Sequence, residues 1–78
     1  MKYRDGKEVK LGDEVIIDSK YSGVVVADID NSEYSESEPK EKWEYLKSGV
    51  IINTDFGGLV HYQEKNLREE EIELKTRN

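Results

Sequence analysis

The fold expected of this chain is decided by the stretch Gly12-Asp13-Glu14-Val15-Ile16-Ile17-Asp18 and, after a short turn, Gly23-Val24-Val25-Val26-Ala27-Asp28-Ile29-Asp30. Valine and isoleucine are β-branched and pack well on a pleated sheet, so residues 14–18 and 23–30 are predicted to form consecutive strands joined by a turn at residues 20–23. Within the second strand, Val24, Val26 and Ile29 cannot share one face by strict alternation. The sequence therefore predicts either a β-bulge in this strand or burial of both its faces.

The rest of the chain predicts three further strands and one helix. A polar, serine-rich loop at residues 31–38 precedes a short helix at residues 39–47, because Pro39 suits a first helical position and Gly49 a helix end. Trp43 and Leu46, with Tyr45, are expected on its inward side. Strands are predicted at residues 50–54, 59–62 and 71–75, and residues 76–78 are expected to fray.

The Gly-Asp turn, the strand that follows it and the glycine-led second strand resemble the opening of SH3-like barrels of the KOW type. The resemblance covers the first third of the chain. It implies a mainly β fold: a five-stranded SH3-like barrel, with one short helix inserted between strands 2 and 3, as a single domain over residues 1–78. KOW domains carry basic loops that contact RNA or protein, whereas the corresponding loop here, at residues 18–22, has only Lys20 as a base.

The charge balance narrows the choice of partner. Twelve basic residues oppose eighteen acidic ones, a net charge of −6, which argues against a general nucleic-acid binder because such proteins use Lys and Arg to displace phosphate counterions. An acidic surface suits a basic protein partner, and it equally serves solubility alone. With no cysteine, no signal-peptide pattern at the N-terminus and no apolar run that could span a bilayer, the chain is expected to be cytoplasmic, with no membrane contact.

No catalytic or cofactor pattern stands out, so we expect a protein that is not an enzyme and needs no cofactor. His61 is the single histidine and has no nucleophile or acid at a marked spacing. Residues Asp28-x-Asp30-x-Ser32 resemble the start of an EF-hand loop, but Glu33 stands at the glycine position and Pro39 at that of the bidentate glutamate. A dedicated metal site is therefore not predicted.

The candidate partner-binding site is the acidic segment from residue 28 to residue 44. Seven acids and two bases give it a charge of −5, most of the net charge of the chain. Aromatic anchors ringed by carboxylates suit contact with a basic surface. Tyr34 is expected to be exposed there, and Trp43 is expected to lie in the core more than at the interface. The predicted site comprises Asp28, Asp30, Glu33, Tyr34, Glu36, Glu38, Glu41, Trp43 and Glu44.

A second resemblance suggests what such a site would do. Residues 39–50, followed by Gly57-Gly58-Leu59-Val60-His61-Tyr62, resemble small bacterial proteins that include immunity proteins of polymorphic toxin systems. This resemblance implies a non-enzymatic inhibitor that occludes a basic toxin or nuclease through the acidic loop and helix. The alternative is a KOW-like module that binds RNA or the transcription or translation machinery through Lys2, Arg4, Lys7 and Lys10.

Overall fold

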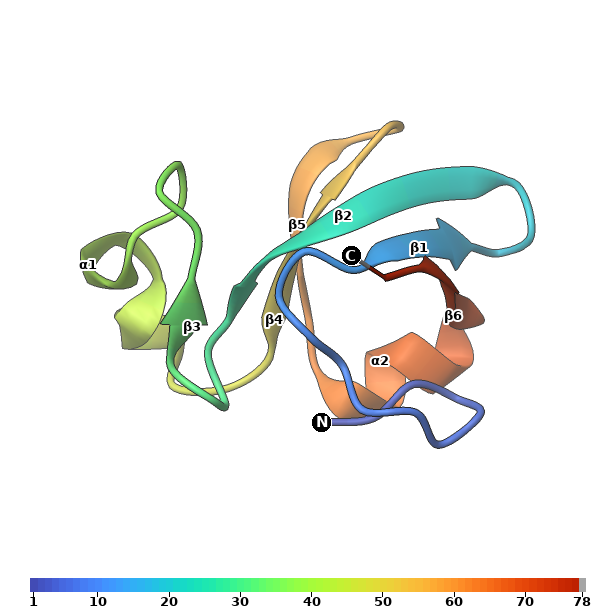
Figure 1. Ribbon diagram of the computed structural model, residues 1–78, viewed down its shortest axis with the longest axis horizontal. Helices are drawn as coiled ribbons and strands as arrows, with labels where there is room; N and C mark the ends of the chain where they lie inside the picture. The colour runs from blue at the N-terminus through green and yellow to red at the C-terminus, as the bar shows by residue number, and fades with distance from the viewer. Residues whose placement is uncertain (78) are drawn as a thin grey trace.

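The computed structural model describes residues 1–77, which form one antiparallel sheet with short helices (Figure 1). In chain order the elements are β1 (Glu14–Ile17), β2 (Tyr21–Asp28), β3 (Glu33–Tyr34), α1 (Lys40–Trp43), the 3₁₀ helix η1 (Glu44–Leu46), β4 (Val50–Thr54), β5 (Gly58–Tyr62), α2 (Glu64–Glu69) and β6 (Ile72–Thr76). The prediction of a mainly β domain is confirmed. The insertion between the second and third long strands is also confirmed, but it contains a short strand and a 3₁₀ turn besides the helix.

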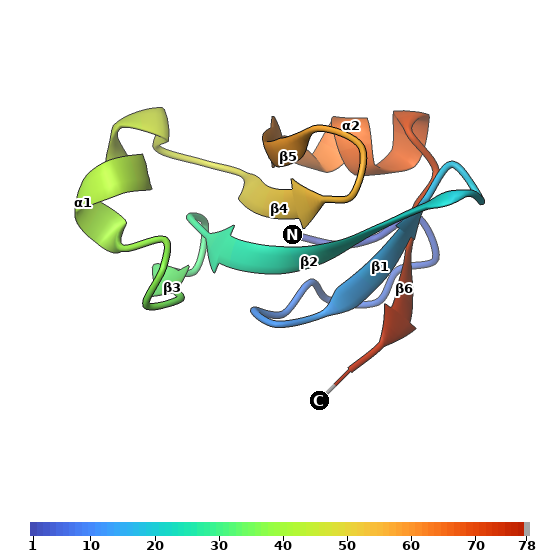
Figure 2. The same ribbon diagram turned by 90° about the horizontal axis from the view of Figure 1, so that it is seen from above.

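The sheet has six strands rather than five, in the order β5-β4-β2-β1-β6, with β3 paired to the end of β2. Within the described residues β5 and β6 lie at opposite edges and do not pair, so the expected closed barrel is not observed. Between these edges runs α2, and its Leu67 is fully buried in the main core. Helix α2 thus lies where a closing pair of strands would have been (Figure 2).

Both alternatives predicted for β2 occur together. Its register against β4 shifts between Val25 and Ala27, which marks a β-bulge. Before the bulge Val25 faces the main core, opposite Ile52; after it Ala27 lies opposite Ile51 in a second, smaller core. The extra residue therefore turns the end of β2 toward the other face of the sheet, and the sheet is buried on both faces at that end.

We call residues 29–49 the acidic lobe, and the sheet face beneath it the outer face. The lobe lies at one end of β2, at the left of Figures 1 and 2. The second core consists of Ala27, Ile29 and Ile51, against which Val26, Tyr34, Trp43 and Leu46 pack. The insertion therefore has its own apolar attachment to the sheet.

An arm formed by the first dozen residues covers the main core and is held by one carboxylate. Asp13 is only 1% exposed and accepts hydrogen bonds from the Tyr3 hydroxyl at 2.6 Å and the Lys10 N–H at 2.9 Å. The guanidinium of Arg77 donates to both its oxygens, at 2.9 and 3.0 Å. Burial by itself would raise the pKa of Asp13, but the bonds from Arg77, Tyr3 and Lys10 outweigh burial and lower it. Burial and the same carboxylate raise the pKa of Tyr3.

Two local predictions are wrong. The turn between β1 and β2 spans residues 18–20 rather than 20–23, and its first two residues, Asp18 and Ser19, have positive φ, 54° and 60°. Glycine and asparagine usually occupy such positions, so the usual signal was missing. The chain end was expected to fray, yet Thr76 belongs to β6 and Arg77 is bound to Asp13; Asn78 lies outside the described residues.

Replacing Asp13 by asparagine is expected to destabilise the fold by about 2–3 kcal/mol at pH 7, because it removes charge-assisted bonds at a buried position. Since folding lowers the pKa of Asp13, its contribution is complete above the unfolded pKa of about 4 and is lost as the pH falls through the folded value. Urea unfolding at several pH values between 7 and 2 should show a shallower acid loss in D13N. The control D5N alters an exposed carboxylate and should follow the wild type.

Gly49, where the lobe rejoins β4, is held against β5. Its φ is +100°, and a Cβ atom there would lie 2.5 Å from His61 Nε2 and 2.6 Å from the Tyr62 carbonyl oxygen. Gly49→Ala is therefore expected to cost about 3 kcal/mol, from left-handed strain and overpacking together. The matched control is Gly12→Ala, at φ +87° with nothing within 4 Å, which should cost about 1 kcal/mol from strain alone. Equal losses in thermal unfolding would contradict the close approach of β5.

Candidate functional site

The acidic lobe turns its apolar side chains toward the sheet. Trp43 and Leu46 are half-buried and pack against the second core, as predicted for the inward side of the helix. Tyr34, expected to be exposed, is also half-buried and packs there from β3. These three side chains attach the lobe, so little of their surface remains for a partner.

Glu38 belongs to the framework of the lobe. Its carboxylate is 8% exposed and accepts a hydrogen bond from Trp43 Nε1 at 2.8 Å and an ion pair from Lys42 Nζ at 2.9 Å. The bonds from Lys42, which has the larger effect, and from Trp43 lower the pKa of Glu38, although burial alone would raise it. The Lys42 ammonium also lies 5.2 Å from the Trp43 ring centroid. Glu38 thus fixes the indole and the start of α1.

Asp28 and Asp30 close the base of the lobe. Asp28 is fully buried and accepts from the Asn31 side-chain amide at 2.8 Å, which shapes the turn after β2. Asp30 accepts from the Gly49 N–H at 2.8 Å, beside a backbone bond from Ile29 to Gly49. Asp30 thus joins the two segments at the base of the lobe, and Asp28 shapes the turn that leads into it. The sequence analysis had placed both carboxylates in the partner contact.

The remaining acids of the predicted site are exposed. They share the solvent-facing surface of the lobe with the bases Lys40 and Lys47 and with Lys42, which is paired with Glu38. These acids are Glu33 on β3, Glu36 in the following turn, Glu41 on α1 and Glu44 on η1. Among them Tyr45 is 68% exposed, the most exposed of the large hydrophobic side chains described. We call Glu33, Glu36, Glu41, Glu44 and Tyr45 the lobe surface.

The prediction that Tyr45 faces inward is wrong. The α-helix ends at Trp43 and continues as a 3₁₀ turn, so Leu46, not Tyr45, joins Trp43 against the sheet. A signal was present in the sequence, because residues two apart on a helix do not share a face and Trp43 was already assigned to the core. An exposed aromatic directly after Glu44 follows from that assignment.

The basic N-terminal stretch is partly neutralised within the chain. Arg4 forms an ion pair with Glu71 at 2.9 Å, and Lys7 with Asp5 at 3.6 Å. Lys2 and Lys10 form no ion pair with residues in the described range. The four bases therefore do not act as one free cationic surface.

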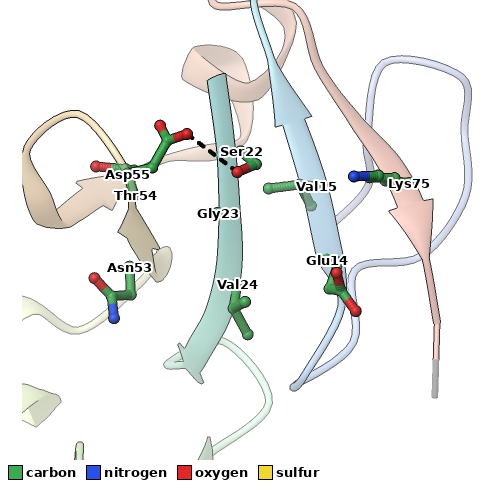
Figure 3. Close-up of a pocket in the computed structure, with 9 residues that line it drawn as sticks. All are labelled: Glu14, Val15, Ser22, Gly23, Val24, Asn53, Thr54, Asp55 and Lys75. Carbon is green, nitrogen blue, oxygen red and sulfur yellow. Dashed lines mark hydrogen bonds between the residues drawn. The ribbon is translucent and has the colours of Figure 1, made fainter. Parts of the chain in front are cut away.

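A concave feature lies on the outer face of the sheet, away from the lobe. It is a shallow hollow of about 290 Å³ over β2, between β4 on one side and β1 and β6 on the other (Figure 3). Across it the Ser22 hydroxyl is hydrogen-bonded to Asp55 at 3.2 Å. The hollow is lined by Glu14, Val15, Ser22, Gly23, Val24, Asn53, Thr54, Asp55 and Lys75. Sequence reasoning missed it, because two of the strands that line it, β4 and β6, are distant in the chain from β1 and β2.

His61 has a structural contact, with Nε2 2.8 Å from the Ser48 carbonyl oxygen at the base of the lobe. Over residues 1–77 no three acidic or histidine side chains lie close enough together to hold a metal ion, which includes the region of Asp28 and Asp30. In the same range no helix has the length and apolar character needed to cross a membrane. What the geometry offers chemically is a lobe with exposed carboxylates and one exposed aromatic ring, and a hollow lined by polar and apolar residues.

Comparison of the chain with models of protein families, with curated proteins and with solved structures found no match. The candidate site is therefore defined by its own geometry: the lobe surface and, on the same face of the sheet, the hollow over β2.

Proposed function

We propose that this protein is a non-enzymatic binding domain. Its acidic lobe binds a basic surface of a partner protein and inhibits the partner by covering that surface. One observation carries the proposal: the lobe turns its apolar side chains toward the sheet and leaves four carboxylates and Tyr45 facing solvent. The partner class that suits this surface is a cationic protein such as a nuclease toxin, whose nucleic-acid cleft is positively charged.

We also propose that the domain is an SH3-like barrel left open between β5 and β6. The strand order β5-β4-β2-β1-β6 and the helix between the last two strands support this assignment. In this architecture the lobe occupies the connection between the second and third long strands.

The lobe surface divides the work of binding between charge and burial. Exposed carboxylates gain little energy as individual pairs in water, but together they speed the encounter with a cationic surface. Tyr45 contributes a large apolar ring with a polar tip, and such residues often carry much of an interface's energy. Cationic side chains of a partner would also be attracted to the face of this ring.

The alternative, RNA binding through the N-terminal bases, has less support. Arg4 and Lys7 are paired with acids of the same chain, and Glu64 accepts a hydrogen bond from the Lys2 backbone N–H. The acids that bind these groups would also repel a phosphate backbone.

The double variant E41K/E44K tests the lobe surface. Both carboxylates are exposed, so the variant should fold normally. The partner is captured from the source cell at low salt, and its association rate with the immobilised protein is measured from 50 to 500 mM NaCl. For the wild type we expect the rate to fall steeply with salt; for the variant we expect a loss of roughly tenfold at 50 mM and a flat salt response.

The matched control is E69K/E70K, which changes the net charge by the same amount at exposed positions on and after α2. It should retain most of the wild-type rate. An equal loss in both variants would mean that net charge alone governs binding, and a wild-type rate that ignores salt would refute electrostatic steering. Tyr45→Ala should leave the association rate unchanged and raise the dissociation rate.

A further inference from the structure

We propose that the hollow over β2 is a second contact for the same partner, and that it receives an apolar side chain flanked by Lys or Arg on an extended segment. This inference rests on the proposed function, because the basic character of the segment is that of the partner assigned to the lobe. It adds a second contact site and specifies the residue types of the partner segment that binds there.

The outer face exposes two apolar side chains at and beside the hollow. Val24 lies directly opposite Asn53, and Asn53 opposite Leu59, so the line across β2, β4 and β5 has an apolar side chain at each end and an amide between them. Val24 and Leu59 are each 39% exposed, although both belong to strands of the sheet. The same face is covered under the lobe and open here, so these two apolar side chains lack a cover.

The hollow exists because the next outer-face residue on β2 is small. Ser22 stands between the walls formed by β1 and β4, and its hydroxyl and carbonyl bind the Asp55 side chain and N–H at 3.2 and 3.0 Å. A serine in mid-sheet leaves room for an incoming side chain, while Asp55 is held at the rim (Figure 3).

The rim charges favour a cationic segment. Glu14 and Asp55 are exposed at the hollow, and Glu73 lies on the same face, opposite Ile16; Lys75 is the base among the lining residues. Within the described residues none of these three acids is in an ion pair. A second copy of this chain is a poor occupant, because each copy carries a charge of −6.

The hollow and the lobe are connected through β2. Val24 borders the hollow, and Ala27, three residues further along the strand, lies in the core beneath the lobe. At about 3.3 Å per residue the two features are roughly 10 Å apart, a distance that three or four residues of an extended peptide cover. The base of the lobe therefore lies within reach of a short extended segment that occupies the hollow.

The test uses the full chain and a defined probe, the peptide acetyl-Lys-Lys-Leu-Lys-Lys-amide, in ¹H–¹⁵N NMR titrations at 50 mM salt. We expect amide shifts at Ser22, Val24 and Asn53 as well as on the lobe. With glycine in place of leucine the lobe shifts should remain and those at the hollow should disappear, with about a tenfold weaker affinity for losing one buried leucine. An all-glutamate analogue should not bind.

Two substitutions at one position separate the hollow from general effects of mutation. Ser22→Phe fills the hollow with a residue that strands accept well, and should reduce leucine-peptide affinity to that of the glycine peptide. Ser22→Ala keeps the hollow open and should bind almost as the wild type does. Equal behaviour of the two variants would overturn the inference, as would equal hollow shifts for the leucine and glycine peptides.

The outcomes also distinguish this inference from the proposed function. Lobe shifts without hollow shifts would overturn the inference and leave the proposed function standing. Hollow shifts that persist in E41K/E44K while lobe shifts are absent in the wild type would support the hollow and count against the lobe. Self-association in sedimentation velocity that Ser22→Phe abolishes would identify a second copy as occupant and overturn the inference.

Discussion

The β-bulge in β2 is the constraint on which the rest of this structure depends. It turns one strand from the main core, at Val25, to the second core, at Ala27, and so allows one sheet to be buried on both faces at one end. Without that extra residue every outer-face side chain of β2 beyond it would change face. Trp43 and Leu46 of the lobe would then lack the apolar surface against which they pack.

The two ends of the chain are held by a different kind of interaction. The main core draws Tyr3 and Val9 from the N-terminal arm and Leu67 from α2, since the sheet leaves a gap between β5 and β6. Asp13 ties this arrangement together, because a buried carboxylate needs several donors and finds them on the arm and on Arg77. Local strands thus supply most of the sheet, and the buried Asp13, with the Arg4–Glu71 ion pair and the bond from the Lys2 N–H to Glu64, fastens the termini to it.

The lobe illustrates how a polar insertion becomes an ordered surface. Aspartates and glutamates of the same sequence segment have different roles. Asp28, Asp30 and Glu38 accept hydrogen bonds from within the domain, whereas the side chains of the lobe-surface acids accept none from residues 1–77. Fixing the first group limits the entropy that the second would lose on binding, so a preorganised surface can use more of its contact energy for affinity. The hollow extends that surface along the same strand.

The sequence by itself determined the elements whose signals are local. β-Branched runs located β1, β2 and β4, and the two-glycine turn before it located β5. Alternation located β6, the valine pattern implied the bulge, and the charge of the insertion could be read directly. Only the tertiary structure decided that the sheet stays open, that Glu38 and Asp28 are buried, that Tyr45 and not Tyr34 faces solvent, and that Ser22 lies at a hollow. The physical reason is that burial and hydrogen-bond partners depend on residues far apart in the chain, whereas propensity and charge belong to neighbours along it.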